Sequence, residues 1–264
     1  MKEQILSHFT TECPWRDTLY WYHTIDSTNT RAKELAKEGA PAGTVLIAGN
    51  QTGGRGRLGR SFSSPEGMGV YLSVILRPDC KAEQLMHLTC AAAVAACKAV
   101  ESACGILPGI KWINDLVCGK EKLGGILTEM SVNANGFVDW AVVGIGINCC
   151  QKKEDFPAEL QNMATSLLLQ TGKTCPPALL AARLAESLYE INAMLFEKQK
   201  IMDIYRLNCV TLGQKILVVR GDESAYGEAL DLDEDGGLLV RYDDGTEKVV
   251  SSGEVSIRGM YGYV

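Results

Sequence analysis

At Gln51-Thr52-Gly53-Gly54-Arg55-Gly56-Arg57-Leu58-Gly59-Arg60, arginines alternate with glycines between two apolar runs, 43–49 and 69–76. The glycines let a ligand approach the backbone closely, and guanidinium groups favour two-point contacts with carboxylates and phosphates. The stretch has neither the Gly-Lys-Ser/Thr ending of a Walker loop nor the helix-opening position of a dinucleotide fingerprint. Because each apolar run predicts a buried strand, we interpret the stretch as a loop between two strands that becomes ordered around an anion. A solvated surface loop is the alternative.

Size and composition indicate a soluble globular protein. The chain has 264 residues, of which 46% are hydrophobic and 22% charged, so it can bury one substantial core with a smaller appended domain. The formal net charge of −6 argues against a general nucleic-acid binder, which needs a basic surface. No secretory signal opens the sequence, and its longest apolar segment, 88–100, is too short to span a bilayer. These features predict a cytoplasmic protein without a membrane segment.

The ten cysteines favour core packing over a disulfide framework or a zinc site. No Cys-x-x-Cys pair occurs, and Cys90, Cys97 and Cys104 recur at heptad spacing within a helical pattern, where cysteine behaves as a small buried hydrophobe. We therefore expect reduced thiols. The three histidines lie far apart in the sequence, so the chain offers no dedicated cluster for a metal ion.

Strand and helix patterns are mixed up to about residue 211, and short strands follow. Predicted strands cover 19–25, 43–49, 69–76, 109–117, 122–129 and 139–148, and predicted helices cover 30–37, 82–104, 166–170, 177–200 and 201–208. Further strands at 215–219, 225–232, 237–242 and 247–251 are separated by Asp/Gly-rich turns and indicate a small all-β barrel. The sequence is therefore divided into two domains, 1–211 and 212–264.

Three further segments place polar groups where a ligand can reach them. Residues 26–29, Asp-Ser-Thr-Asn, either cap the following helix or present hydroxyl and amide groups to a small polar ligand. Asn114 and Asp115 offer oxygens that suit Mg²⁺ or a turn. Lys122 precedes Leu-Gly-Gly, where missing side chains let a ligand come close. A solvated surface lysine is the alternative for Lys122.

Five motifs in order, followed by the β-rich tail, resemble biotin protein ligases. The motifs are Ser27-Thr-Asn, the Gly-Arg-Gly-Arg-x-Gly-Arg loop, Lys111-Trp-x-Asn-Asp115, Lys122-Leu-Gly-Gly-Ile-Leu and Gly144-Ile-Gly-Ile-Asn148. The resemblance extends over about residues 19–260. It implies an α+β fold, in which a mixed β-sheet packed with helices, like the catalytic domain of class II aminoacyl-tRNA synthetases, precedes a small C-terminal β-barrel.

The resemblance also assigns roles to individual residues. Positions that bind biotin are Ser27, Thr28, Asn29, Gln51, Gly54, Arg55, Gly56, Arg57, Lys122 and Gly125. Positions that bind the nucleotide are Arg57, Arg60, Phe62, Asn114, Lys122, Asn148, Lys215, Glu254 and Arg258. Catalysis is assigned to Lys122, Arg57, Arg55 and Asp115. For Asp115 two roles stay open, one on the amine of the acceptor lysine and one on Mg²⁺.

Two positions depart from the family pattern. Ile113 stands where proline is usual, so we expect a less rigid turn there. Phe62 stands where an aromatic residue, often tryptophan, covers the adenine, and the smaller ring is expected to stack less.

The resemblance implies ATP-dependent formation of biotinyl-5′-AMP and transfer of biotin to a lysine of a biotin carboxyl carrier protein, with Mg²⁺ accompanying ATP. A lipoate–protein ligase is the nearest alternative enzyme, and the arginine/glycine loop and the C-terminal barrel favour biotin over lipoate. A biotin-sensing repressor is the alternative from a different class. The catalytic domain begins almost at once, leaving no room for a helix-turn-helix, so we expect no specific DNA binding. A homodimer through an exposed sheet edge is a further expectation.

Overall fold

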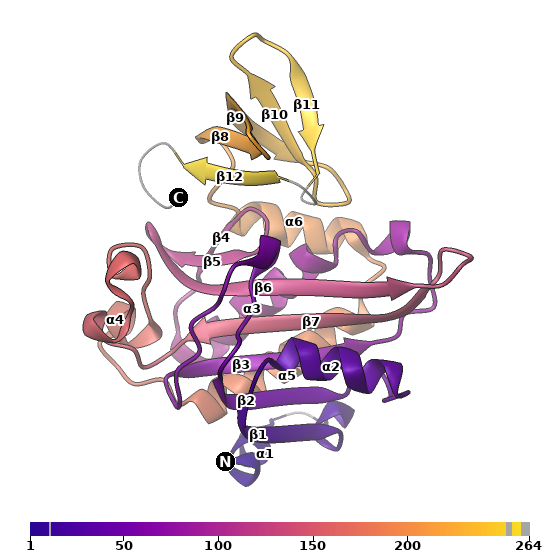
Figure 1. Cartoon of the computed structure of the whole chain (residues 1–264), viewed down its shortest axis with the longest axis vertical. Helices are drawn as coiled ribbons and strands as arrows, with labels where there is room; N and C mark the ends of the chain where they lie inside the picture. Colours follow the sequence, from indigo (N-terminus) through magenta and orange to yellow (C-terminus); the bar gives the residue numbers. More distant parts are fainter. Residues whose placement is uncertain (11, 252–254, 260–264) are drawn as a thin grey trace.

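The computed structural model of the chain describes residues 1–10, 12–251 and 255–259, the last of these by their backbone alone. Its centre is a seven-stranded sheet with the order β1-β2-β3-β7-β6-β5-β4 (Figure 1). The strands are β1 Leu19–Ile25, β2 Val45–Gln51, β3 Gly69–Leu76, β4 Gly109–Lys111, β5 Asp115–Cys118, β6 Glu121–Val132 and β7 Val138–Asn148. β1 and β2 run parallel, and the other neighbouring pairs are antiparallel. The predicted mixed sheet packed with helices is confirmed.

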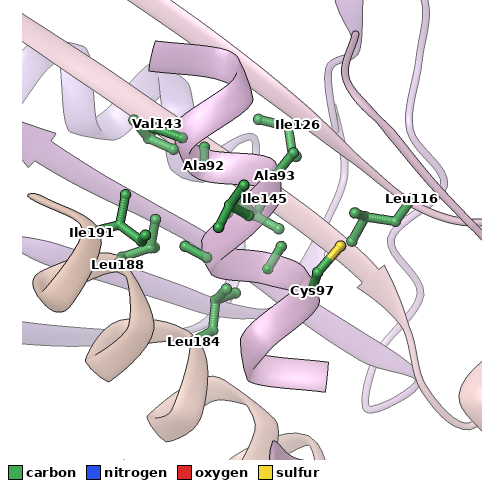
Figure 2. Packing of buried hydrophobic residues seen from close by; sticks show 14 of the residues in the cluster. Ala92, Ala93, Cys97, Leu116, Ile126, Val143, Ile145, Leu184, Leu188 and Ile191 are labelled. Atoms are coloured by element: carbon green, nitrogen blue, oxygen red, sulfur yellow. The ribbon is translucent and has the colours of Figure 1, made fainter. Parts of the chain in front are cut away.

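One face of this sheet carries the main hydrophobic core. The helices on this side are α1 Lys2–Ser7, α3 Leu88–Cys104, α5 Pro177–Ala193 and α6 Lys198–Asn208 (Figure 1). Figure 2 shows Ala92 and Ala93 of α3 among buried side chains of the sheet, Val143 and Ile126, and Leu188 of α5. The small side chains of α3 let the helix approach both neighbours closely, so the helix is buried nearly all round.

The segment that contains α3 differs in detail from the prediction. Ala82–Leu85 forms a short 3-10 helix, η3, and the α-helix begins at Leu88 and ends before Gly105, which has the left-handed conformation. By length and composition alone, Ala82–Cys104 is long and apolar enough to cross a membrane, which the shorter run 88–100 did not suggest. However, 72% of its apolar window is buried inside the fold, as expected for a core helix.

The opposite face of the sheet is covered in part by α2 (Thr28–Lys37), which begins two residues earlier than predicted. Ser27 caps this helix, because its side chain accepts a hydrogen bond from Thr30 N. Ala32 and Ala36 pack on a smaller apolar cluster of the sheet, which comprises Leu46, Ile75, Trp140 and Val142. The part of this face that α2 leaves uncovered contains the candidate site.

The remaining short elements connect these layers. They are η1 Pro14–Arg16, η2 Arg57–Gly59, η4 Lys153–Asp155, η5 Ala158–Leu160 and α4 Leu167–Thr171. The predicted division between helices at residue 200 is wrong by several residues, since α5 ends at Ala193 and α6 begins at Lys198. The chain turns between them at Met194, whose backbone is no longer helical.

A second sheet of five strands forms the C-terminal part of the chain. Its order is β11-β10-β9-β8-β12, and its strands are β8 Lys215–Arg220, β9 Glu223–Leu232, β10 Leu238–Tyr242, β11 Glu247–Val250 and β12 Val255–Gly259. Among the described residues no pairing joins β11 to β12, so the sheet is open where the sequence predicted a barrel. This sheet lies next to α6 (Figure 1), and Trp112 Nε1 donates a hydrogen bond to its Gly236 O at 2.8 Å.

The expectation that all cysteines are reduced is wrong for one pair. Cys104, at the end of α3, forms a disulfide with Cys175, just before α5. The two residues are 71 positions apart, and sequence spacing gave no sign that the two chain segments meet. The other eight cysteines, all within the described residues, are free thiols. For Cys90 and Cys97 the predicted role as buried hydrophobes is confirmed.

Candidate active site

A row of cross-strand partners forms the floor of a cavity on the α2 side of the sheet. The row is Tyr71, Gly146, Gly125, Asp115 and Lys111, on β3, β7, β6, β5 and β4, and all of these except Tyr71 line the cavity. Residues directly opposed on neighbouring strands point to the same face, so the two glycines leave a hollow between an aromatic ring and two charged groups. This row brings together residues that are up to 75 positions apart in the sequence.

The neighbouring row makes the hollow longer. Ser73 lies opposite Gly144, which in turn lies opposite Leu127. A side chain on Gly144 would overlap the amide oxygen of Asn29, and one on Gly146 would place its Cβ 2.5 Å from the Phe62 ring. Glycine is therefore required at both positions if Asn29 and Phe62 are to lie over the sheet.

Polar side chains at the start of α2 and the end of β2 form one end of the cavity. Thr28 donates to Gln51 Oε1 from its backbone N at 2.8 Å, and Gln51 Nε2 donates to Ser64 Oγ at 2.9 Å. Ser73 Oγ donates to Asn29 Oδ1 at 2.6 Å. The structure confirms Ser27 as the cap of the helix and places Ser27, Thr28 and Asn29 in the lining of the cavity, where binding of a polar ligand stays a prediction.

The arginine/glycine loop forms the second wall. It folds back on itself, because Gly56 N donates to Arg60 O and Phe62 N donates to Gly54 O. Leu58 has a positive φ of 54° within this turn. The Phe62 ring lies edge-on to Tyr71 with 6.5 Å between the ring centroids. The predicted loop between two strands is confirmed, and the ring of Phe62 is placed above the glycine floor.

Three charged groups meet where the loop faces β5 and β6. Arg57 NH1 donates to Asn114 Oδ1 at 3.1 Å, and Lys122 Nζ lies 2.6 Å from Asp115 Oδ1. Burial lowers the pKa of Arg57, with Asp115 acting in the opposite direction and Arg60 adding to the decrease. An anion in the cavity would offset both the loss of solvent and the repulsion between the arginines.

The cavity has a volume of about 510 Å³, a size typical of small-molecule sites. Thirteen of the predicted site residues line it: Ser27, Thr28, Asn29, Gln51, Arg55, Gly56, Arg57, Arg60, Phe62, Asn114, Asp115, Lys122 and Gly125. No group of three or more His, Cys, Asp or Glu side chains able to hold a metal ion occurs in the described part of the chain.

Five predicted residues lie elsewhere or cannot be placed. Gly54 is buried under the loop, where a Cβ would overlap the backbone of Phe62. Asn148 uses its amide inside the protein, donating to Thr165 O at 3.0 Å and accepting from Gln151 at 3.1 Å. Lys215 is exposed at the start of β8, outside the lining. Glu254 lies outside the described residues, and Arg258 is described by its backbone in β12 alone.

Sequence reasoning missed part of the lining. The missed residues are Leu58, Ser61, Lys111, Trp112, Ile126, Leu127, Gly144, Ile145, Gly146, Asn162 and Met163. Lys111 was quoted within a motif but not assigned to the site, although its strand register with Asp115 would have indicated it. Met163 reaches the cavity because its carbonyl accepts from Lys122 N at 2.7 Å, a contact between irregular segments that no periodic pattern predicts.

Comparison with known proteins identifies the family. The model of the Biotin/lipoate A/B protein ligase family matches residues 21–148, and that of the Biotin protein ligase C terminal domain matches residues 211–258. A Bacillus subtilis protein, Bifunctional ligase/repressor BirA, is 36% identical over 244 residues, which cover 89% of this chain and 72% of that relative. The chain belongs to the biotin protein ligase family.

Two further biotin protein ligases are similar over most of their length. The Mycobacterium tuberculosis biotin–[acetyl-CoA-carboxylase] ligase is 34% identical over 87% of this chain and 85% of its own. The solved structure of the Aquifex aeolicus biotin protein ligase in complex with biotin and ATP superposes with a TM-score of 0.77 and 31% identity. That match covers 91% of this chain and 98% of the Aquifex chain.

At the position where this family usually has proline, the Trp112–Ile113 peptide bond of this chain is cis.

Proposed function

We propose that this protein activates biotin with ATP to biotinyl-5′-AMP and transfers biotin to a lysine of a biotin carboxyl carrier protein. In the first step the biotin carboxylate attacks the α-phosphorus of ATP and pyrophosphate leaves. In the second step the lysine amine attacks the acyl carbon, and AMP leaves with the electrons of the broken C–O bond. Both steps take place at the cavity between the sheet and the arginine/glycine loop.

The charge of the cavity lining carries this proposal. Among the described lining residues there are five cationic side chains, those of Arg55, Arg57, Arg60, Lys111 and Lys122, and one carboxylate, that of Asp115. A carboxylate and a triphosphate repel each other, so a site that brings them into contact needs such an excess of fixed positive charge. An uncharged, apolar ligand would gain no binding energy from this excess of positive charge.

We assign the roles of individual residues on their positions in the cavity together with the family resemblance. Ser27, Thr28, Asn29 and Gln51 bind the polar ring of biotin at the start of α2. Arg55, Arg57 and Lys122 neutralise the reacting carboxylate and the α-phosphate, which stabilises the transition state electrostatically. Arg60, Phe62 and Asn114 bind the nucleotide. We also assign Gly54, Asn148, Lys215, Glu254 and Arg258 to the ligand-binding positions on the family resemblance.

The mixed anhydride is sensitive to water, and the loop 53–60 has a clear purpose if it orders over the adenylate. Mg²⁺ enters with ATP and supplies charge neutralisation for the phosphates when bound. Asp115 is the carboxylate of the lining that fits it, because magnesium sites typically combine one or two carboxylates with phosphate oxygens and water. Asp115 orients either this ion or the attacking amine.

Several finer points belong to the same proposal. They are the division into domains 1–211 and 212–264 and the likeness to class II aminoacyl-tRNA synthetases. The acceptor is the carrier domain of a biotin-dependent carboxylase, the location is cytoplasmic, and a homodimer through a sheet edge is expected. No specific DNA binding is expected. A mobility shift of an operator-length DNA by this protein at physiological salt would contradict this.

A comparison of biotin with lipoate tests the choice of substrate. The purified protein is incubated with ATP and Mg²⁺ and either acid, and release of pyrophosphate is measured. Pyrophosphate release and adenylate formation with biotin alone are the expected result. Activation of lipoate in preference to biotin would assign the protein to the lipoate branch of the family.

A further inference from the structure

Asn29 is held in the cavity by hydrogen bonds that use most of its amide. Its Nδ2 donates to Leu127 O at 3.2 Å and to Glu129 Oε2 at 3.0 Å, and its Oδ1 accepts from Ser73 Oγ at 2.6 Å. An amide offers two N–H donors and two oxygen lone pairs. Among the described residues, these contacts leave one lone pair of Oδ1 for a ligand above Gly144.

Glu129 and the backbone carbonyl of Leu127, both acceptors, together fix which end of this amide faces the cavity. An ionised carboxylate only accepts hydrogen bonds, so it pairs with Nδ2 of Asn29 and not with Oδ1. Its second oxygen, Oε1, lies 2.6 Å from Lys33 Nζ. Both side chains are less than a third exposed, at 29% for Glu129 and 24% for Lys33, so solvent screens this pair less than a surface pair.

The orientation of Asn29 extends to the neighbouring hydroxyl groups. Ser73 is fully buried, and its Oγ lies 2.6 Å from Asn29 Oδ1 and 2.7 Å from Thr28 Oγ1. A serine hydroxyl has a single proton. In the observed orientation, Asn29 Oδ1 accepts the proton of the Ser73 hydroxyl. A reversed amide would present Nδ2 instead, and the Ser73 hydroxyl would then donate to Thr28 Oγ1. The hydroxyl of Thr28 also donates to Gln51 Oε1 at 3.1 Å.

We propose that Glu129, held by Lys33, is a positioning residue for biotin. Glu129 does not line the cavity and acts through Asn29, whose Oδ1 then accepts a hydrogen bond from an N–H group of the ureido ring. A ligand that places a hydrogen-bond acceptor opposite Asn29 Oδ1 would bring two lone pairs together and would bind less tightly. The inference rests on the proposed function, since it assigns the ring of biotin to this end of the cavity.

A double-mutant cycle tests this role. Biotin affinity is measured by titration calorimetry, without ATP, for the wild type, Glu129→Gln, Asn29→Ala and the double variant. Glutamine can turn either a donor or an acceptor to Asn29, so Glu129→Gln is expected to raise the Kd for biotin about tenfold. Since Glu129 acts through Asn29, the same substitution in the Asn29→Ala background is expected to leave the Kd unchanged.

A separate structural role for Glu129 would give a different result. Glu129→Gln would then weaken biotin binding by the same factor in both backgrounds, or not at all, and either outcome overturns the proposal. The Kd for ATP and the melting temperature of Glu129→Gln are expected to match the wild type. Glu190→Gln, which breaks the exposed pair with Lys98 on the helical side, is the matched control and is expected to bind biotin normally.

Two measurements keep the test decisive. Should Glu129→Gln fail to fold, Lys33→Met leaves the carboxylate in place but loosens it, and about a threefold rise in the biotin Kd is expected. An unchanged Kd for Lys33→Met contradicts the proposal. Failure of the proposed function is distinguishable, because the wild type itself would then bind no biotin.

Discussion

On β7, Val143 and Ile145 pack beneath α3, whereas Gly144 and Gly146, which alternate with them, leave room for a ligand on the opposite face. Along β6 the contrast is less complete, because Ile126 belongs to the main core and also lines the cavity beside Gly125. Successive side chains of a strand point to opposite faces, so one sequence can build both surfaces independently. The covered face supplies packing energy, and the open face gives up packing so that polar groups can reach a ligand.

The contrast predicts that substitutions on the two faces separate function from stability. Changes on the open face reduce binding or transfer and leave melting nearly unchanged. Changes on the covered face reduce melting and leave the affinity for biotin nearly unchanged. The following predictions are ordered from the largest expected effect to the smallest.

Lys122→Ala and Arg57→Ala are expected to lower the rate of biotin transfer by about 10²–10³, the typical cost of removing one preorganised electrostatic donor. Melting is expected to stay near that of the wild type, because the Lys122–Asp115 pair is partly exposed. Lys153→Ala is the matched control. Lys153 pairs with Glu121, which lies next to Lys122 on β6, and neither residue of this pair lines the cavity. Normal transfer by both site variants would refute the site assignment.

Gly144→Ala closes the open face at one position. The added Cβ overlaps Asn29 Oδ1, so the amide must shift away from the position in which it faces the ligand. We expect biotin affinity to fall about 100-fold, since a ligand group left without its hydrogen-bond partner in the closed site costs about 1–3 kcal/mol of binding free energy. Calorimetric titration with biotin measures the loss. An affinity like that of the wild type would show that Asn29 is not part of the ligand site.

Ile147→Ala tests the covered face on the same strand. Ile147 is fully buried in the main core, and truncation of such a side chain typically costs about 2–5 kcal/mol of unfolding free energy. Chemical denaturation measures this loss, and biotin affinity is expected to remain unchanged. Loss of biotin binding at full stability would contradict the separation of the two faces.

His87 gives the smallest effect, through pH. The ring is fully buried with Nε2 2.7 Å from Leu195 O, and burial lowers its pKa. Below about pH 6.5, the pKa of a histidine in the unfolded chain, His87 is protonated in the unfolded state but stays neutral in the folded state. The stability contributed by neutral His87 is therefore complete above that pH and is lost as the pH falls.

The measurement for His87 is the change in melting temperature between neutral and mildly acidic buffer. A smaller decrease is expected for His87→Gln than for the wild type, because glutamine does not titrate in this range. An equal decrease in the two proteins would assign the acid sensitivity to other groups.

The sequence predicted the strands and the loop well, because their patterns are local. The span of β3, Gly69–Leu76, was predicted to the residue. The loop Gly53–Arg60 was placed between its two strands, and most of its residues line the cavity. For these segments, composition and period contain the information that the fold uses.

The missed features depend on contacts between distant segments. Lys111 and Asp115 share a row only because β4 and β5 pair in one register, and Glu129 meets Asn29 across 100 positions of sequence. The Cys104–Cys175 disulfide likewise joins two elements whose proximity no spacing rule gives. β12 was not predicted as a strand, because it pairs with β8 rather than with a neighbour in sequence.

Transfer of biotin to an acceptor tests the central claim most directly. The purified protein is incubated with ATP, Mg²⁺, biotin and the carrier domain of a biotin-dependent carboxylase, and the intact mass of the carrier is measured. The account predicts the mass gain of a single biotinyl group, which disappears when ATP is left out or when the acceptor lysine is replaced by arginine. An unmodified carrier, with no biotinyl-5′-AMP formed on the protein, would contradict it.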